Sequence, residues 1–506
     1  MQYVILLVLL AAQVLVAQQR TVGLISSSPS ACYDGYTLFA PIAGRTTYLL
    51  DNDGQVVHLW QSATPPGQAV MLLEDGSLLR TGSPQVQAMG GGGAGGIIEK
   101  ISWDGTVIWK YDHYGQTYRS HHDVEVLPNG NILLLVWESH TVAEALAAGR
   151  IQSRLVENAL WSERVIEVKQ TGPSSGEVVW SWSSWDHMIQ DADPAKPNYG
   201  VVKEHPERID INSGGNRSDW LHANSVRYNP LRDEVMISIH NLHEIWIISR
   251  KSGDIVYRWG NPQIYKSGTA SQQRLWGQHD ARWLPDDWSR IMIFNNGIGR
   301  PGGNASSVDI VELPLLPDGQ YRRTAATPYE PAQAAVAYPP SLSGKFYAQN
   351  ISGATRLPNG NTLSCLGPSG TFIETTPNNE EVWRYVNPVS QNGITPQGGT
   401  PRNNMVFKIY RYSKDFPAFL GKRLTPRGRI EDGPLGVNDA AHGLEYRVLI
   451  NTIDRTVRVD VSTGGRYRFV AYDILGRNLG VVFDGDCASG TYTFQLPAYT
   501  MFVMRQ

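Results

Sequence analysis

The sequence predicts an all-β fold, a six-bladed β-propeller followed by a small antiparallel β-sandwich, and three observations support this prediction. A phrase that begins with His recurs three times, a second phrase made of a turn and an aromatic strand recurs between its copies, and the pattern changes after about residue 435. Composition agrees, because 50 Gly, 15 Trp and 23 Tyr among 506 residues favour short strands joined by tight turns.

The first phrase opens with a histidine in three copies: HDVEVLPNG from His122, HANSVRYNP from His222 and HDARWLPDD from His279. Two related copies lack the histidine and begin at Gln68 and Ser352. An Asn-Gly or Asp-Gly pair in such a phrase predicts the tight turn of a hairpin. The five copies therefore mark the inner strands of five blades.

The second phrase supplies the outer strands of the repeat. Its copies are DGQVVHLW (53–60), DGTVIWKY (104–111), GEVVWSW (176–182), GDIVYRW (253–259) and NEEVWRYV (379–386). A turn followed by alternating apolar residues is typical of a half-buried strand. Four antiparallel strands per repeat, arranged around a circle, make a β-propeller.

The two ends of the propeller predict a sixth blade. Residues 35–60 supply outer strands with no inner strand ahead of them, and MVFKIYRYS (405–413) offers the missing one. Joining the two ends would remove the exposed edges of the ring. The count favours six blades over seven and assigns residues 21–430 to the propeller.

The N-terminal segment predicts an exported protein. Residues 1–17 form a short apolar run that ends in Ala17, which favours a signal peptide over a membrane anchor. Residues 440–506 alternate apolar and polar residues between Gly-rich turns and predict the small sandwich. We expect the periplasm, cell surface or extracellular space as the location. The net charge of −3 gives no reason to expect nucleic acid or an anionic membrane as partner.

The cysteines and two long insertions add smaller expectations. Cys32, Cys365 and Cys487 permit one disulfide and leave one thiol, so core burial must hold the chain together. Residues 139–165 and 185–219 interrupt the repeat near His-bearing segments. They are either the lid or rim of a site or stabilising surface loops.

The three histidines predict a shared site, because residues at one phase of a closed ring should converge on its axis. A single His at the start of a strand is more often structural, but three at one phase favour a function as nucleophile, base or acid. Three His also make a common zinc set. However, Asp123 and Asp280, which follow two of them, should point to the opposite face of the strand. We expect no metal and no cofactor.

Several other residues extend the predicted site. Gln68 and Ser352 occupy the matching places in two further blades, and His240 should reach the channel from the second strand of the His222 blade. His121 should point away from His122 by strand alternation.

A candidate anion site lies in the blade that follows the His222 blade. Asn296 ends a strand there and is followed by the Gly-rich loop that carries Arg300. An Arg among glycines suits close approach to an anion. Arg119 is a weaker candidate for the same role.

At the level of whole phrases, the chain resembles the bacterial arylsulfate sulfotransferase family. The resemblance rests on HHDVEVLPNGNILLL, DWLHANSVRYNP, GQHDARWLPD followed by IMIFNNG, and SGATRLPNGNTL, and it covers about residues 35–390. It implies an exported six-bladed propeller that moves a sulfuryl group from a phenolic sulfate to a phenol, without a nucleotide donor. It also implies His279 as the nucleophile that becomes a sulfohistidine, with His122 and His222 binding the sulfuryl oxygens and assisting proton transfer.

Two features depart from the family pattern. A sulfate-binding Arg of that family is replaced by Ile239, and His240 and Arg300 are the candidates for its role. The disulfide that some members carry near the site has no counterpart at Cys365. The leading function is sulfuryl transfer. The alternatives are a non-catalytic secreted propeller that binds a ligand or surface partner in its channel, and an oxidoreductase propeller carrying a metal or quinone.

The C-terminal segment has a resemblance of its own. VRVDV, RFVAYDILGRNLG and SGTYTFQL resemble the C-terminal sorting domain of the type nine secretion system. This resemblance implies the secretion machinery as a partner, and an ordinary accessory sandwich is the alternative.

Overall fold

The computed structural model describes residues 20–285, 287–338, 346–433, 446–451, 456–461, 465–473, 478–488, 490–495 and 500–505. The predicted signal peptide, residues 1–17, lies outside the described residues. The propeller prediction is confirmed, because six antiparallel sheets form the blades of a ring.

Each blade runs from an inner strand at the axis to an outer strand at the rim. Blade 1 has β29 (Tyr410–Ser413), β2 (Gly35–Phe39), β3 (Thr46–Leu50) and β4 (Val56–Gln61). Blade 2 has β5 (Pro66–Leu72), β6 (Leu78–Gly82), β7 (Ile97–Ile101) and β8 (Val107–Asp112). Blade 3 has β9 (Tyr118–Val126), β10 (Ile132–Thr141), β11 (Ala159–Gly172) and β12 (Ser175–Ser183).

The other three blades repeat this order. Blade 4 has β15 (Ala223–Asn229), β16 (Glu234–Ile239), β17 (Glu244–Ser249) and β18 (Ile255–Trp259). Blade 5 has β19 (His279–Leu284), β20 (Asp287–Asn295), β21 (Ser307–Glu312) and β22 (Ala335–Tyr338). Blade 6 has β23 (Gly353–Arg356), β24 (Thr362–Leu366), β25 (Thr371–Thr375), β26 (Glu381–Val386) and, at its outer edge, β1 (Gly23–Ser27).

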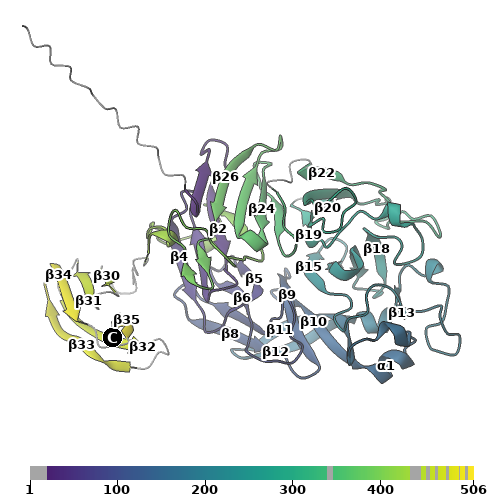
Figure 1. Ribbon diagram of the computed structural model, residues 1–506, viewed down its shortest axis with the longest axis horizontal. Helices are drawn as coiled ribbons and strands as arrows, with labels where there is room; N and C mark the ends of the chain where they lie inside the picture. Colours follow the sequence, from purple (N-terminus) through teal and green to yellow (C-terminus); the bar gives the residue numbers. More distant parts are fainter. Residues whose placement is uncertain are drawn as a thin grey trace, which may run out of the picture.

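Two strand exchanges close the ring. As predicted, the 405–413 segment completes the first blade, where β29 pairs with β2. In addition, β1 from the N-terminal side pairs with β26 of blade 6. Figure 1 shows the purple N-terminal strands beside the green strands of blade 6. Both exchanges pair backbone groups that would otherwise form open sheet edges.

The hydrophobic core is divided into six clusters, one between each pair of neighbouring blades. Each blade therefore buries both of its faces. The middle strands consequently read as continuous apolar runs: β10 contains Ile132-Leu-Leu-Leu-Val-Trp137, and all six residues are buried. The predicted half-buried strands are the outer ones, of which β8 and β12 are partly exposed.

Short elements connect the blades. One α-helix, α1 (Val142–Ala147), lies in the first insertion, and the parallel pair β13 (Met188–Ile189) and β14 (Ile209–Asp210) lies in the second. A hairpin joins β27 (Val389–Ser390) to β28 (Gly393–Ile394). The 3-10 turns are η1 (Gln152–Arg154), η2 (Ser184–His187), η3 (Val202–Glu204), η4 (His240–Leu242), η5 (Ala270–Gln272), η7 (Gly367–Ser369), η8 (Pro417–Phe419) and η9 (Ile430–Asp432). No helix in the described part of the chain is long and apolar enough to cross a membrane.

The C-terminal segment forms two three-stranded antiparallel sheets, in agreement with the predicted sandwich. One sheet contains β30 (Tyr446–Asn451), β31 (Thr456–Val461) and β34 (Gly490–Gln495). The other contains β33 (Asn478–Cys487), β32 (Gly465–Asp473) and β35 (Thr500–Arg505). All three cysteines are free, so the one disulfide that the count permits does not form.

Candidate active site

The inner strands of blades 3, 4 and 5 are interrupted where their histidines stand. The pairing register shifts between His121 and Val124, between Ala223 and Ser225, and between His279 and Arg282. His122 and His222 adopt the left-handed region, with φ of 50° and 54°. Such bulges re-aim side chains, and non-glycine residues with positive φ are uncommon outside special sites.

The predicted convergence of the histidines is confirmed. The ring centroids of His122 and His222 are 4.6 Å apart. His240 continues the row, 5.4 Å from His222 and 5.2 Å from His279. His122 and His279 are buried at the two ends of this histidine row, while His222 and His240 are partly exposed. We use "histidine row" for these four residues.

Asn296 fixes the protonation of His279. The Nδ1 atom of His279 lies 2.8 Å from the Oδ1 atom of Asn296 and 3.1 Å from the carbonyl oxygen of Gly277. The amide nitrogen of Asn296 donates to the carbonyls of Ala348 and Ile351, at 2.9 and 3.0 Å, which sets its orientation. Nδ1 therefore carries the proton, and Nε2 keeps its lone pair. Burial, followed by the proximity of the His240 imidazole, holds the pKa of His279 well below 6.5.

His222 is held in the opposite state. Its Nδ1 atom lies 2.5 Å from the Oδ2 atom of Asp219. Burial opposes the charged imidazole, but the hydrogen bond and charge of Asp219 raise the pKa of His222 above 6.5. His222 is therefore the cation of the row. By contrast, burial and the charge of His222 lower the pKa of His240 to about 4.

The prediction that His121 points away from His122 is wrong. The two Nδ1 atoms lie 2.8 Å apart, and the Nε2 atom of His121 lies 2.9 Å from the Oε2 atom of Glu163 on β11. Strand alternation fails here because the bulge places His122 in the left-handed region. The same bulge leaves Asp123 facing away from the row, as predicted.

A cavity of about 660 Å³ opens beside His222 and His240. Both insertions contribute to its wall, with Glu157 and Trp161 from the first and residues 215–219 from the second. Among the described residues that line this cavity, Arg217 is the one Arg or Lys. Arg217 is exposed, so the lining of the cavity includes one long cationic side chain.

A glycine-rich loop covers His122. A Cβ atom built on Gly93 would lie 2.1 Å from the Cε1 atom of His122, so the loop passes directly over the imidazole. Gly91 and its neighbours also line the cavity. The side chain of Arg119 donates to the carbonyls of Gly95, Val86, Ala88 and Pro84 and to the hydroxyl of Ser83. Arg119 therefore anchors this loop.

Three predicted site residues lie outside the histidine row. Arg300 lines a separate cavity, where it donates to Ser307 at 2.9 Å and lies over the ring of Trp276. The Ser352 hydroxyl donates to the carbonyl of Asn350 and accepts from the backbone of Gly367. The backbone of Gln68 has a positive φ of 101°, and its buried Oε1 atom has no hydrogen-bond partner among the described residues.

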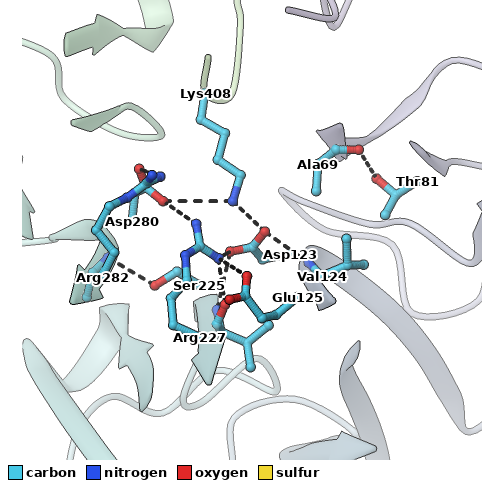
Figure 2. A network of polar contacts seen from close by, with 12 residues as sticks. Ala69, Thr81, Asp123, Val124, Glu125, Ser225, Arg227, Asp280, Arg282 and Lys408 are labelled. Carbon is cyan, nitrogen blue, oxygen red and sulfur yellow. Dashed lines mark hydrogen bonds and ion pairs between the residues drawn. The ribbon is translucent and has the colours of Figure 1, made fainter. Parts of the chain in front are cut away.

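An ion-pair network fills the other side of the inner strands. Arg227 donates to Asp123 at 2.7 Å and to Asp280 at 2.8 Å, and Lys408 bonds Asp123. Figure 2 shows Lys408 and Arg227 bridging the two carboxylates, with Arg282 beside Asp280. Although burial opposes ionisation, Arg227 and Lys408 hold the pKa of Asp123 below 3.8.

Sequence reasoning missed four contributors to this region: Glu163, Asp219, Arg217 and Lys408. One had a visible signal, because Asp219 opens the phrase DWLHANS three residues before His222. Within the described ranges, no group of three or more His, Cys, Asp or Glu side chains is arranged to hold a metal ion.

The fold and the row together define a class of protein, a six-bladed propeller whose inner strands build a histidine site beside an open cavity. The family model described as arylsulfotransferase (ASST) matches residues 27–392, which is more than half of the chain. The protein belongs to this family. Membership supports a sulfotransferase-like enzyme that acts on small aryl sulfates and phenols.

Searches for individual relatives add little. No functionally curated protein matches the chain. Similar solved structures include a protein of unknown function from Bacteroides caccae, with 13% identity, 75% of this chain and 98% of that chain covered, and a TM-score of 0.39. They also include virginiamycin B lyase from Staphylococcus aureus, with 10% identity, 72% of this chain and 84% of that chain covered, and a TM-score of 0.35. A periplasmic gluconolactonase from Pseudomonas aeruginosa has 12% identity, 92% of this chain and 99% of that chain covered, and a TM-score of 0.35. At these scores they carry no argument about function.

Proposed function

We propose that the protein transfers a sulfuryl group from an aryl sulfate to a phenol through a covalent intermediate on His279. The observation that carries this proposal is the pair of acceptors around the Nδ1 atom of His279. They leave a neutral imidazole with a free lone pair on Nε2, which is the form needed for nucleophilic attack.

The transfer takes two half-reactions. In the first, Nε2 of His279 attacks sulfur, the S–N bond forms, and the S–O bond to the phenolate breaks. In the second, the acceptor phenol loses its proton and its oxygen attacks the same sulfur, which releases Nε2. Because the group rests on the enzyme between the two steps, the kinetic order is ping-pong.

Stabilisation of the developing charge is assigned to His222, and attraction of the donor is assigned to Arg217. The His222 imidazolium lies between His122 and His240 in the row, so it can bind a sulfuryl oxygen as negative charge shifts toward the leaving group. Arg217, in the lining of the cavity, attracts the anionic donor. It replaces the sulfate-binding Arg that the family carries where this chain has Ile239.

Export is part of the proposal. The apolar run 1–17 would carry the chain out of the cytoplasm, and residues 440–506 would engage a type nine secretion machinery. Fractionation of cells that express the full chain or a chain ending at residue 433 tests this idea. We expect the full chain at the cell surface or in the medium and the shortened chain in the periplasm.

Intact-protein mass spectrometry after brief exposure to 4-nitrophenyl sulfate tests the chemistry. We expect one added sulfuryl group on the peptide that bears His279, and release of 4-nitrophenol that continues only when a phenol is present. His279→Ala should remove both signals. His205→Ala, an exposed histidine paired with Glu207, is the control and should keep both. Unchanged turnover in His279→Ala would overturn the mechanism.

The second candidate function is ligand binding without turnover, and it is favoured by the replacement of the family's Arg with Ile239. The same experiment separates the two. Binding of the aryl sulfate without any adduct or released phenol would support the non-catalytic propeller.

A further inference from the structure

A chain of hydrogen bonds leads from the histidine row into the interior of blade 3. Glu163 contacts the Nε2 atom of His121 at 2.9 Å, and the Nδ1 atom of His121 contacts the Nδ1 atom of His122 at 2.8 Å. All three residues are buried, with 1%, 3% and 2% of their surface exposed. The ring of His121 also stacks on Trp137, at 4.1 Å between centroids, which fixes its plane.

Proton counting restricts this chain to two forms. A hydrogen bond between two nitrogens holds one proton, and so does a bond between a nitrogen and a carboxyl oxygen. If Glu163 is protonated, His121 carries its proton on Nδ1 and His122 carries its proton on Nε2. If Glu163 is ionised, His121 carries its proton on Nε2 and His122 carries its proton on Nδ1. The Nε2 atom of His122 is then an acceptor without a proton.

We propose that Glu163 and His121 form a proton relay that lets His122 act as the acid toward the departing phenolate and as the base toward the incoming phenol. This inference rests on the proposed function and deepens it. Glu163 and His121 act through His122 and are positioning residues, while His122 is the group proposed to exchange the proton with the phenol.

The proton balance closes over one turnover. As the donor's S–O bond breaks, His122 gives its Nε2 proton to the phenolate, His121 passes its Nδ1 proton to His122, and Glu163 passes its proton to the Nε2 atom of His121. The product leaves as a neutral phenol, and Glu163 is ionised. When the acceptor phenol arrives, its proton follows the same atoms back, and Glu163 is neutral again.

The surroundings suit the neutral resting form. Burial, followed by the charge of Asp219, raises the pKa of Glu163 well above 4.5, and burial lowers the pKa of His121 well below 6.5. The charged neighbours facing this chain are Asp219 and His222, which bond each other. The Oε1 atom of Glu163 accepts from the backbone nitrogen of Ala223 at 2.7 Å, so the carboxyl group is held in place on both sides.

The test is the dependence of sulfo-enzyme formation on the leaving group, measured in single turnovers with a series of aryl sulfates. Glu163→Gln keeps a donor toward His121 but offers no acidic proton. We expect donors whose phenols have high pKa values to react about 10²–10⁴-fold more slowly, because that is the usual contribution of general acid catalysis. 4-Nitrophenyl sulfate should change by less than about tenfold, because 4-nitrophenolate leaves without a proton.

Two further variants keep the test decisive. Glu163→Asp retains an acidic proton and should recover part of the rate with poor leaving groups. Glu167→Gln is the matched control, because Glu167 lies on the same strand, is buried and bonds Asn129, Asn131 and Arg250 instead. It should leave the leaving-group dependence unchanged.

The outcomes are distinct. An equal loss of rate with every donor in Glu163→Gln would mean a purely structural role and overturn the relay. If the unmodified protein forms no sulfo-enzyme at all, the proposed function fails instead, before the relay is reached. Circular dichroism of each variant confirms that the propeller is folded.

Discussion

The two sides of the inner strands solve the same physical problem in opposite ways. His122 and Asp123 are neighbours in sequence, as are His279 and Asp280, yet the histidine rings lie in the row and the aspartates face the ion-pair network. In the network every carboxylate meets a cation, and Lys408 bonds Asp123. In the histidine row, the buried imidazoles of His122 and His279 have no partner of opposite charge among the described residues.

This difference separates a structural cluster from a candidate reactive one. Both groups are buried and rich in ionisable side chains, so burial alone does not identify a site. A nitrogen with a free lone pair close to a cavity is a better sign of a site, because a matched ion pair has no proton or electron pair left to offer. The comparison leads to three predictions, in decreasing order of expected effect.

Removing Lys408 should cost stability and leave the chemistry intact. Lys408→Met leaves Asp123 and Asp280 buried with fewer partners, which should lower the free energy of unfolding by about 3–5 kcal/mol. Urea denaturation measures this change. Lys266→Met removes an exposed partner of Asp191 and should cost less than about 1 kcal/mol. An equal midpoint for Lys408→Met and the unmodified protein would contradict the prediction.

Removing Asp219 should shift the pH dependence of transfer. In the proposed mechanism activity needs protonated His222, so we expect it to fall as pH rises through the raised pKa of that residue. It also falls at low pH, where His279 becomes protonated, because the pKa of His279 is lowered. Asp219→Asn leaves burial in place but removes the charge and the carboxylate acceptor. The descending limb should therefore move to lower pH by about 1–2 units, since a hydrogen bond to a charged group contributes about 1.5–3 kcal/mol.

A pH–rate profile for kcat measures this shift. Asp287→Asn changes a partly exposed carboxylate that pairs with Arg290 far from the row, and it should leave the limb in place. A limb that stays where it was in Asp219→Asn would mean that His222 is not the titrating group.

Removing Arg217 should have the smallest effect, and mainly on binding. Arg217→Gln should raise KM for aryl sulfates about 5–10-fold with little change in kcat, because an exposed cation attracts the donor before and during the reaction alike. The difference should shrink in high salt. Arg322→Gln removes an exposed Arg outside the cavity lining and should leave KM unchanged. A fall in kcat alone would contradict the prediction for Arg217.

Much of the architecture was predictable because repeats reveal phase. The common phase of His122, His222 and His279 predicted their convergence, and the unmatched outer strands at residues 35–60 predicted the ring closure that β29 provides. The same logic placed Gln68 and Ser352 at matching positions of the repeat. However, the position in a repeat does not determine whether a side chain reaches the site, and the Ser352 hydroxyl bonds its own loop.

The rest of the site was hidden for two physical reasons. Bulges break strand alternation without leaving a mark in the hydrophobic pattern, which is why the contact between His121 and His122 was missed. Glu163 comes from β11, the third strand of blade 3, and Arg217 comes from an insertion, and no repeat fixes the position of either residue. Lys408 lies just ahead of the closing strand, and sequence gives no sign that it would meet Asp123.

The exchange that seats β29 at the centre of the ring has a consequence for timing. Every histidine of the row has been synthesised once residue 279 is made, yet the innermost strand of blade 1 spans Tyr410–Ser413. A nascent chain therefore contains all four imidazoles of the row long before it contains the strand that closes the ring. We therefore expect the row to be aligned only late in synthesis, near the end of the propeller, and a chain cut before β29 to lack this alignment.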